Sequence, residues 1–279
     1  MRFTKYQALG NDYLVIEPGE ISGGLTPHHV RRICDRHYGV GSDGILFGPL
    51  PTLEADFTLL IFNPDGSEAE KSGNGLRIFA QHLWECGRVD CEPAWFSVQT
   101  RGGVVHCQVQ PGGGSVTVEM GRVSFASQDI PVMGPPREVL NERMEVDGES
   151  LICCAATLGN PHCVVLGEQV SPELAQRLGP LIECAPQFPK HTNVQFMQVL
   201  DGENIRIEIW ERGAGYTLAS GSSSCAAAAV AHRLGWCGQD ITVHMPGGQL
   251  SVSLSPDWFA TLSGPVQRVF DGILNLESG

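Results

Sequence analysis

The chain has 279 residues, with 18 Lys and Arg against 31 Asp and Glu, a formal net charge of −13, and 42% hydrophobic residues. This composition is typical of a globular protein with enough apolar material for one large core or two medium ones. The acidic excess repels phosphate groups, which argues against nucleic acids and anionic membrane surfaces as partners. The first ten residues lack the apolar segment of a signal peptide, so we expect a soluble, cytoplasmic protein.

Ten cysteines and nine histidines are scattered along the chain. The cysteines form no CxxC pair, and no group of Cys and His has the spacing of a zinc finger. We therefore expect no metal site, and we expect most cysteines to be small buried apolar residues.

In the first half, local signals predict one capped helix, a second helix and two strands. Thr26 is an N-cap followed by Pro27, an apolar stripe follows over 30–34, and Gly39 comes after the expected end of the helix. The segment Asn74–Trp84 reads as a second helix. Apolar and polar residues alternate at 104–109 and 116–120, which predicts strands.

The second half gives the same kinds of signal. Ser171 and Pro172 open a helix whose apolar residues include Leu174 and Leu178. Ile205–Ile209 alternates with a period of two, as a half-buried strand does, and 250–254 reads the same way. The expected helix Ser223–Leu234 is apolar nearly all round, which is typical of a buried helix.

Five features of the first half recur in the second half, in the same order and at a nearly constant separation. The pairs are Leu9–Asn11 with Leu158–Asn160, Thr26–Pro27 with Ser171–Pro172, Phe57–Asn63 with Ile205–Glu211, Ser72–Gly73 with Ser220–Gly221, and Phe96–Gly103 with Ile241–Gly248. One match alone would carry no weight, but the series indicates a duplicated unit. We therefore expect an α+β protein of two similar domains, each with strands around one central helix.

Small polar loops precede both expected central helices, at 70–75 and 218–224. Free N–H groups and the dipole at a helix start bind anions such as carboxylates, although these residues could equally be plain N-caps. If both helix starts face one ligand, Ser72 and Ser220 flank it from opposite sides. Two opposed groups suit inversion of a stereocentre, since one removes a proton and the other returns it.

Several sequence blocks carry a resemblance that covers nearly the whole chain. The blocks are Ala8–Tyr13, Asp35–His37 with Gly39–Gly41, Phe62–Ser67, Ser72–Gly75, Gly159–Cys163, Asn193 with Phe196–Val199, Glu211–Gly215, Ser220–Ser222 and Pro246–Gly248. On these blocks the chain resembles the diaminopimelate epimerases, amino-acid epimerases that work without pyridoxal phosphate.

The resemblance implies an α+β fold of two pseudo-symmetric domains, each a mostly antiparallel sheet or barrel around a central helix. We expect an N-terminal domain of residues 1–121 plus 266–279, a C-terminal domain of residues 122–265, and a site in the cleft between them. The resemblance also implies a small amino-acid substrate, no cofactor and a homodimer.

Residue roles follow from the same resemblance. The catalytic residues are then Ser72 and Ser220, and His162 and Glu211 set their protonation. The residues that hold the distal amino-acid end of the substrate are Asn11, Asn63, Asn160, Asn193 and Arg212. The cradle of the reacting α-carboxylate comprises Gly73, Asn74, Gly221 and Ser222. Without the resemblance, His162 reads as a core histidine and Glu211 as a surface charge at a strand end.

The sequence also departs from the family. The family has cysteine at both catalytic positions, and a serine hydroxyl is a much weaker acid than a thiol. Gly44 stands where the family tends to have Gln, and Ser223–Ser224 replaces a smaller turn that contains Gly. Because the changes are distributed, we favour a native serine form over a two-point edit made to trap substrate.

The activity expected is therefore interconversion of LL- and meso-diaminopimelate by two-base proton transfer at the α-carbon, in the pathway to lysine and peptidoglycan precursors. Two alternatives stay open. One is a related racemase with another amino-acid substrate, for which Gly44 is the hint. The other is an inactive amino-acid-binding form, either native or engineered.

Overall fold

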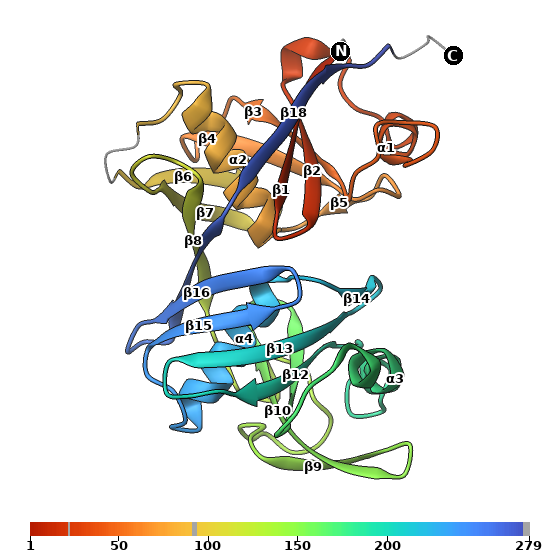
Figure 1. The fold of residues 1–279 in the computed structure, drawn as a ribbon, viewed down its shortest axis with the longest axis vertical. Coiled ribbons are helices and arrows are strands. Elements are labelled where there is room, and N and C mark those ends of the chain that lie inside the picture. The colour runs from red at the N-terminus through yellow and green to blue at the C-terminus, as the bar shows by residue number, and fades with distance from the viewer. Residues whose placement is uncertain (22, 91–93, 276–279) are drawn as a thin grey trace. The chain divides into compact units, whose positions relative to one another are not determined.

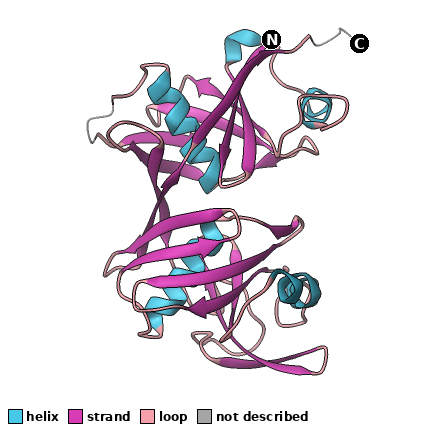
Figure 2. Cartoon of the chain, in the orientation of Figure 1, coloured by secondary structure: helices cyan, strands magenta, loops and turns pink. Residues whose placement is uncertain are grey.

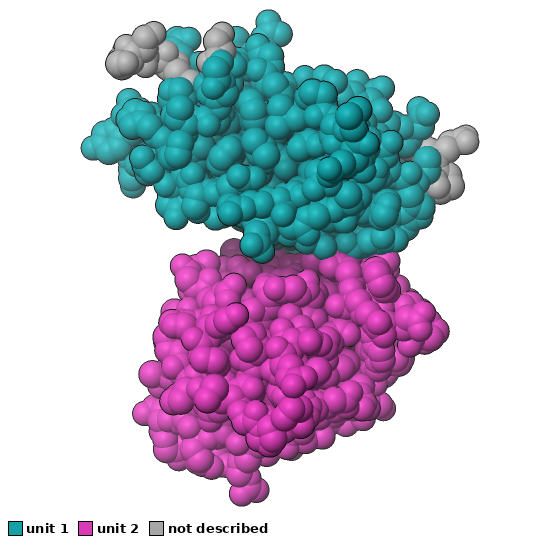
Figure 3. All heavy atoms as spheres, turned by 180° about the vertical axis from the view of Figure 1, so that it is seen from behind, with its two compact units in different colours: residues 1–119, 263–279 teal, residues 120–262 magenta. Residues whose placement is uncertain are grey.

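The computed structural model describes residues 1–21, 23–90 and 94–275. The chain divides into two compact units, unit 1 with residues 1–119 and 263–279 and unit 2 with residues 120–262, coloured separately in Figure 3. The last four residues of the expected N-terminal domain, 276–279, lie outside the described residues, as does Cys91.

Unit 1 combines strands and helices from the N-terminal part of the chain with strands from its C-terminal end, β18 and the last residues of β17 (Figure 1). Its elements are β1 (Arg2–Ala8), β2 (Asn11–Ile16), η1 (Pro18–Glu20), α1 (Pro27–Cys34), β3 (Ile45–Leu50), β4 (Phe57–Phe62), β5 (Glu68–Ala69), α2 (Gly73–Glu85), β6 (Phe96–Thr100), β7 (Gly103–Val109), the first part of β8 (Ser115–Arg122) and β18 (Gln267–Ile273). The last strand, β18, pairs antiparallel with the first, β1.

Unit 2 is continuous in sequence. Its elements are the end of β8, β9 (Glu142–Val146), β10 (Glu149–Thr157), β11 (Pro161–Leu166), α3 (Pro172–Glu183), β12 (Asn193–Val199), β13 (Asn204–Glu211), β14 (Gly215–Thr217), α4 (Gly221–Arg233), β15 (Asp240–Met245), β16 (Gly248–Leu254) and the first part of β17 (Phe259–Pro265).

The two units repeat one pattern of strand pairing. In unit 1, β1 and β2 are antiparallel, β2 and β3 parallel, β3 and β4 antiparallel, β4 and β6 parallel, and β6 and β7 antiparallel. In unit 2, β10, β11, β12, β13, β15 and β16 repeat this sequence of directions. Helices α1 and α2 occupy the parallel connections of unit 1, and α3 and α4 those of unit 2. The duplication expected from the sequence is confirmed.

Each unit wraps its strands around one long helix, α2 or α4 (Figure 2). Helix α4 is buried on nearly all sides because Ala and other small residues fill it, from Ser223 to Ala231. Helix α2 is buried from Asn74 to Leu83. The expected α+β class, with a central helix in each half, is confirmed.

The shorter helices begin where the sequence signals place them. Thr26 caps α1 and Ser171 caps α3, and each side chain accepts a hydrogen bond from a backbone N–H three residues later. Helix α1 ends at Cys34, because a tight turn follows in which two N–H groups of Val40 and Gly41 bind the Ile33 carbonyl. Gly39 follows this end, as expected from the sequence.

Cysteines are mostly core residues, as expected. Of the cysteines in the described ranges, Cys86 and Cys184 are exposed and the others are buried, all as free thiols. No helix among the described residues is long and apolar enough to cross a membrane.

Candidate functional site

In unit 1, the start of α2 presents Ser72. It is the N-cap, with extended backbone, and its Oγ accepts a hydrogen bond from the N–H of Gly75 at 3.0 Å. The hydroxyl of Tyr13, on β2, lies 3.3 Å from the same Oγ. The serine oxygen therefore has two polar neighbours, one from the helix backbone and one from a phenol.

A chain of amides beside Ser72 is held in fixed orientations. Arg77, fully buried on α2, donates to Asn74 Oδ1 at 2.6 Å. Asn74 Nδ2 then donates to Asn11 Oδ1 at 3.1 Å, and Asn11 Nδ2 donates to Asp43 Oδ2 at 3.0 Å. Because each amide both donates and accepts within the chain, neither can rotate freely. Asn11 and Asn74 are thus linked directly, whereas the resemblance assigns them to different ends of the substrate, and their roles stay predictions.

Asn63 lies in a separate turn that follows β4. Its backbone N–H donates to the Ser67 carbonyl at 2.9 Å, and its Nδ2 donates to Ser67 Oγ at 3.0 Å. Among the hydrogen bonds of the described residues, none links Asn63 to Ser72, Asn11 or Asn74. The structure therefore does not join Asn63 to the amide chain.

In unit 2, the start of α4 presents Ser220, which is 5% exposed. Its side chain makes no capping bond to the helix within the described residues, unlike that of Ser72. Instead it faces the carboxyl group of Glu211, the last residue of β13. Burial raises the pKa of Glu211, and the side chains of Ser220 and Thr217 partly oppose this rise. Glu211 is not the simple surface charge that its sequence position indicated.

His162 lies on β11 with no exposed surface. Burial lowers the pKa of His162 to about 3, so the imidazole is neutral at ordinary pH. Its Nε2 lies 3.1 Å from Asn160 Oδ1, and Asn160 Nδ2 donates to Ser222 Oγ at 3.4 Å. Within the described residues its Nδ1 has no well-formed hydrogen bond, although the Gln195 amide lies beside the ring. His162 and Asn160 are thereby linked to the first turn of α4.

Arg212 follows β13 and is exposed, and hydrogen bonds fix both its backbone N–H and its guanidinium. Asn193 Oδ1 accepts from the Arg212 N–H at 3.0 Å, and Asn193 Nδ2 donates to the Pro161 carbonyl at 2.9 Å. The guanidinium donates to the Lys190 carbonyl at 3.1 Å. Asn193 therefore positions the Arg212 backbone, and the direct contact with substrate that the resemblance implies stays a prediction.

Two residues near Ser72 were not assigned roles from the sequence. Tyr13 lies inside a matched block, and its aromatic side chain reads as core until the contact with Ser72 is seen. Arg77 lies three positions after Asn74 on α2, so only helical spacing hints that the two side chains meet.

The structure explains why position 44 carries no side chain. A Cβ placed on Gly44 would lie 2.6 Å from Cε1 of Tyr13 and 2.5 Å from the carbonyl oxygen of Phe62. Any side chain at position 44 would therefore displace the Tyr13 ring or the backbone. Gly44 makes room for the ring whose hydroxyl reaches Ser72.

Side chains of metal-ligating type gather at two places among the described residues, and neither group includes the start of α2 or α4. The groups are Glu17 with His82 and Cys86, and Glu183 with Cys184 and His191. The residues around Ser72 and Ser220 are serines, amides, a phenol and a carboxyl group, which can bind an amino acid and exchange protons.

Comparison with known proteins places these features in a family. The family model described as diaminopimelate epimerase matches residues 3–126 and 154–269. The chain is 54% identical over 277 residues to "Diaminopimelate epimerase 2" of Nostoc sp., covering 99% of this chain and 96% of the relative. It is 39% identical to the diaminopimelate epimerase of Pelotomaculum thermopropionicum, covering 98% of each.

Solved structures share the fold at low sequence identity. A hydroxyproline epimerase from Agrobacterium vitis, with bound trans-4-hydroxy-L-proline, has a TM-score of 0.71 and 18% identity, covering 98% of this chain and 90% of that one. A phenazine biosynthesis protein from Bacillus anthracis has a TM-score of 0.70 and 18% identity, covering 99% of each chain. At these identities the likeness concerns the fold alone.

Proposed function

The chain belongs to the diaminopimelate epimerase family, and from this premise we propose how an isomerase with these residues interconverts LL- and meso-diaminopimelate. The observation that carries the proposal is the matched pair of helix starts, with a serine at the N-cap of α2 and another at the N-cap of α4. Each serine has a titratable neighbour, Tyr13 for one and Glu211 for the other.

We propose that the two helix starts serve one substrate molecule. The first N–H groups of a helix have no partner within the helix, so those of α2 and α4 can hold the α-carboxylate. Inversion at the α-carbon then needs one group that removes the proton and one that returns a proton to the other face. Ser72 and Ser220 are the candidates for these groups, since they occupy equivalent places in the repeat.

We further propose that Ser72 and Ser220 occupy the positions of the family's catalytic cysteines and are native. A serine alone is too weak an acid and its alkoxide too costly for this exchange. Glu211 supplies the basicity that the Ser220 hydroxyl lacks, and Tyr13 supplies the acidity that the Ser72 hydroxyl lacks. Ser220 can accept the α-proton while passing its own hydroxyl proton to ionised Glu211. Ser72 can give its proton to the opposite face and take one from Tyr13, and solvent then restores Tyr13 and Glu211.

His162 supports this arrangement by orientation. A general base works best with a pKa near the working pH, and the pKa of His162 lies at about 3. We therefore assign it the task of fixing Asn160, whose Nδ2 reaches Ser222 in the first turn of α4. Asn193 has the corresponding task for Arg212, whose planar guanidinium fits a carboxylate at the distal end of the substrate.

The test of the activity is proton exchange in deuterated water. LL-diaminopimelate is incubated with the chain as it stands, and NMR follows loss of the α-hydrogen signal together with formation of the meso isomer. We expect both. Binding in calorimetry without exchange would contradict the enzyme and support the binding-protein alternative, whereas exchange on another amino acid but not on diaminopimelate would support the racemase alternative.

A variant separates recognition from chemistry. Arg212→Lys keeps the charge but removes the bidentate hydrogen-bonding geometry of the guanidinium, so we expect weaker binding of diaminopimelate in calorimetry. Arg233→Lys is the matched control, because Arg233 pairs with Glu138 and has no part in the proposal. Equal affinity in the two variants would refute the role of Arg212.

Two properties of the whole protein remain proposals. A cytoplasmic location is supported by the free thiols of the described cysteines, since thiols persist in reducing compartments. A homodimer rests on the family resemblance, and light scattering coupled to size-exclusion chromatography tests it.

A further inference from the structure

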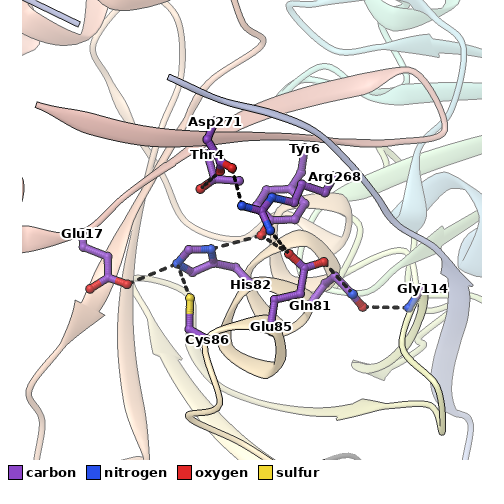
Figure 4. A network of polar contacts seen from close by, with 10 residues as sticks. All are labelled: Thr4, Tyr6, Glu17, Gln81, His82, Glu85, Cys86, Gly114, Arg268 and Asp271. Carbon is purple, nitrogen blue, oxygen red and sulfur yellow. Dashed lines mark hydrogen bonds and ion pairs between the residues drawn. The ribbon is translucent and has the colours of Figure 1, made fainter. Parts of the chain in front are cut away.

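Three side chains of unit 1 converge near the end of α2 (Figure 4). His82 Nε2 lies 3.4 Å from Glu17 Oε1 and 3.7 Å from Cys86 Sγ. Around a tetrahedral Zn²⁺, bond lengths of about 2.0 Å to N and O and about 2.3 Å to S give separations of about 3.3 Å for N and O and about 3.5 Å for N and S. The two separations from His82 Nε2 thus lie close to the edges of such a tetrahedron, and all three donor atoms lie within 4.8 Å of one another.

The local sequence explains why two of these donors are neighbours. His82 and Cys86 are four residues apart at the C-terminal end of α2, so their side chains lie on the same face. The unpaired carbonyl groups at a helix C-terminus carry partial negative charge, which favours a cation there. Glu17, just before η1, comes from a distant part of the sequence and completes the group.

The other ring nitrogen of His82, Nδ1, forms a hydrogen bond, as the second nitrogen of a metal-binding histidine commonly does. Tyr6 Oη lies 3.2 Å from His82 Nδ1 and donates its proton to Glu85 Oε2 at 2.8 Å. With its proton committed to Glu85, the phenol can only accept from Nδ1–H. This arrangement directs the Nε2 lone pair toward Glu17 and Cys86, and a hydrogen-bonded network behind the histidine orients it as in many metal sites (Figure 4).

Glu17 can supply one oxygen, and there is room for further ligands. Arg88 binds the second oxygen, Oε2, at 2.6 Å, which leaves Oε1 facing His82. A cavity of about 570 Å³ opens beside the group and is lined by Glu17, His82 and Cys86 among others. Water can therefore reach the fourth corner of the tetrahedron.

The second group of metal-ligating type is a poorer candidate. In that group, Glu183 Oε2 accepts from Trp210 Nε1 at 2.7 Å, and Oε1 accepts from the Gly213 N–H at 3.1 Å. Both oxygens are thus used to hold the loop before β14. Cys184 remains with His191 alone, yet it is an exposed free thiol like Cys86 and so provides a matched control.

We propose that Glu17, His82 and Cys86 form a Zn²⁺ site, separate from the start of α2 and independent of the epimerase reaction. Zinc binding displaces the thiol proton of Cys86 to solvent, and water completes the coordination. The site ties the end of α2 to the segment between β2 and η1.

The test is metal binding by the intact, reduced chain. Zn²⁺ is titrated against a competing chelator, and Co²⁺ is used as a spectroscopic probe of thiolate coordination. We expect one tight site per chain and a near-ultraviolet thiolate-to-cobalt band. Cys86→Ser should remove the band and weaken Zn²⁺ binding by at least about tenfold, whereas Cys184→Ser should change neither.

A third variant probes the network behind the histidine. Tyr6→Phe removes the acceptor of Nδ1–H, so we expect about 10–100-fold weaker Zn²⁺ binding with the thiolate band retained. Wild-type protein without the band, or equal Zn²⁺ affinity in wild type and Cys86→Ser, would overturn the proposal. These readouts do not depend on epimerase activity.

Discussion

At the scale of single residues, the two serines differ in what their neighbours do. Ser72 Oγ accepts from Gly75 and lies 3.3 Å from the Tyr13 hydroxyl, whereas Ser220 faces a carboxyl group. In the proposed route Tyr13 donates to Ser72, which keeps the Ser72 proton available for a ligand, and Ser220 donates to Glu211, which keeps a lone pair of Ser220 available. These contacts are compatible with Ser72 as the proton donor and Ser220 as the acceptor in one direction of the epimerisation, and the two roles exchange in the reverse direction.

Tyr13→Phe tests the donor side. The ring still fills the space beside Gly44, but the proton that restores Ser72 is removed. We expect deuterium incorporation to fall by about 10²-fold, the lower end for loss of a general acid, with substrate affinity unchanged. Tyr38→Phe, at an exposed tyrosine, should leave the rate as it is. A Tyr13→Phe protein that exchanges at the wild-type rate would refute the proton route through Tyr13.

Glu211→Gln tests the acceptor side and gives opposite effects on rate and stability. Burial raises the pKa of Glu211. The folded state therefore retains this proton when the unfolded state has lost it, so ionised Glu211 lowers stability once the pH exceeds the folded pKa. The Gln variant should lose exchange at every pH. It should also be more stable than wild type at neutral pH and equally stable at acid pH, below the unfolded pKa.

Glu208→Gln is the control for this variant. Glu208 is a buried carboxyl on the same strand, and burial raises its pKa too. We expect a similar gain in stability at neutral pH, measured by urea denaturation, with exchange retained. If both variants lost exchange equally, the effect would belong to strand β13 as a whole and the role of Glu211 would fail.

The sequence could mark the helix starts at which Ser72 and Ser220 lie, because small polar loops precede both helices. The roles of the two serines stay predictions. The sequence could not show that Arg77, Asn74, Asn11 and Asp43 form one chain of hydrogen bonds, because β2 and the turn before β3 are brought to α2 only by the fold. Nor could it show that Gly44 is required by the Tyr13 ring, which needs knowledge of a contact between side chain and backbone.

At the scale of elements, α1, α2 and α3 begin at residues whose side chains cap the helix, and the caps of α1 and α3 are visible in the sequence as Thr26 and Ser171. Local caps act through the next three residues and so need no knowledge of the fold. The parallel pairings of β2 with β3 and β11 with β12 are different, because the register of a strand is set by partners far away in the sequence. Their repetition in both units was foreseeable only through the internal repeat.

The two central helices should respond unequally to loss of their N-cap side chain. Ser72→Ala removes the bond to the Gly75 N–H, which costs about 0.5–2 kcal/mol in typical helices. Ser220→Ala removes no capping bond. Amide hydrogen exchange followed by NMR should therefore show faster exchange of the Gly75 amide in the first variant, and little change in the first turn of α4 in the second. Equal loss of protection in both helices would contradict the difference in capping.

At the scale of the molecule, the repeat provides two equivalent positions for the proposed two-base inversion of a stereocentre. Duplication supplies two equivalent helix starts, and later divergence gives them different neighbours, a phenol in unit 1 and a carboxyl group in unit 2. Neither unit alone holds both a donor and an acceptor in this scheme. The proposal therefore predicts that complete epimerisation needs residues of both units.

Introducing two thiols tests whether one of these two positions removes the α-proton and the other returns it. Ser72→Cys together with Ser220→Cys replaces two weak acids by groups with a reference pKa near 8.5, so the proton can move without help from Tyr13. We expect the double variant to incorporate deuterium at the α-carbon of LL- or meso-diaminopimelate faster than the serine form. Each single variant should gain less, because inversion needs a donor as well as an acceptor.

In the double variant, Tyr13→Phe should have a smaller effect than in the serine chain, because the thiol introduced at position 72 would carry its own proton. This third substitution separates the proton route from a merely structural role of the tyrosine. If the double-cysteine protein folds, binds diaminopimelate and exchanges no faster than the serine form, positions 72 and 220 do not carry the α-proton. The Tyr13 ring and the missing side chain at Gly44 would then indicate a different substrate. The relation to the epimerases would be one of ancestry.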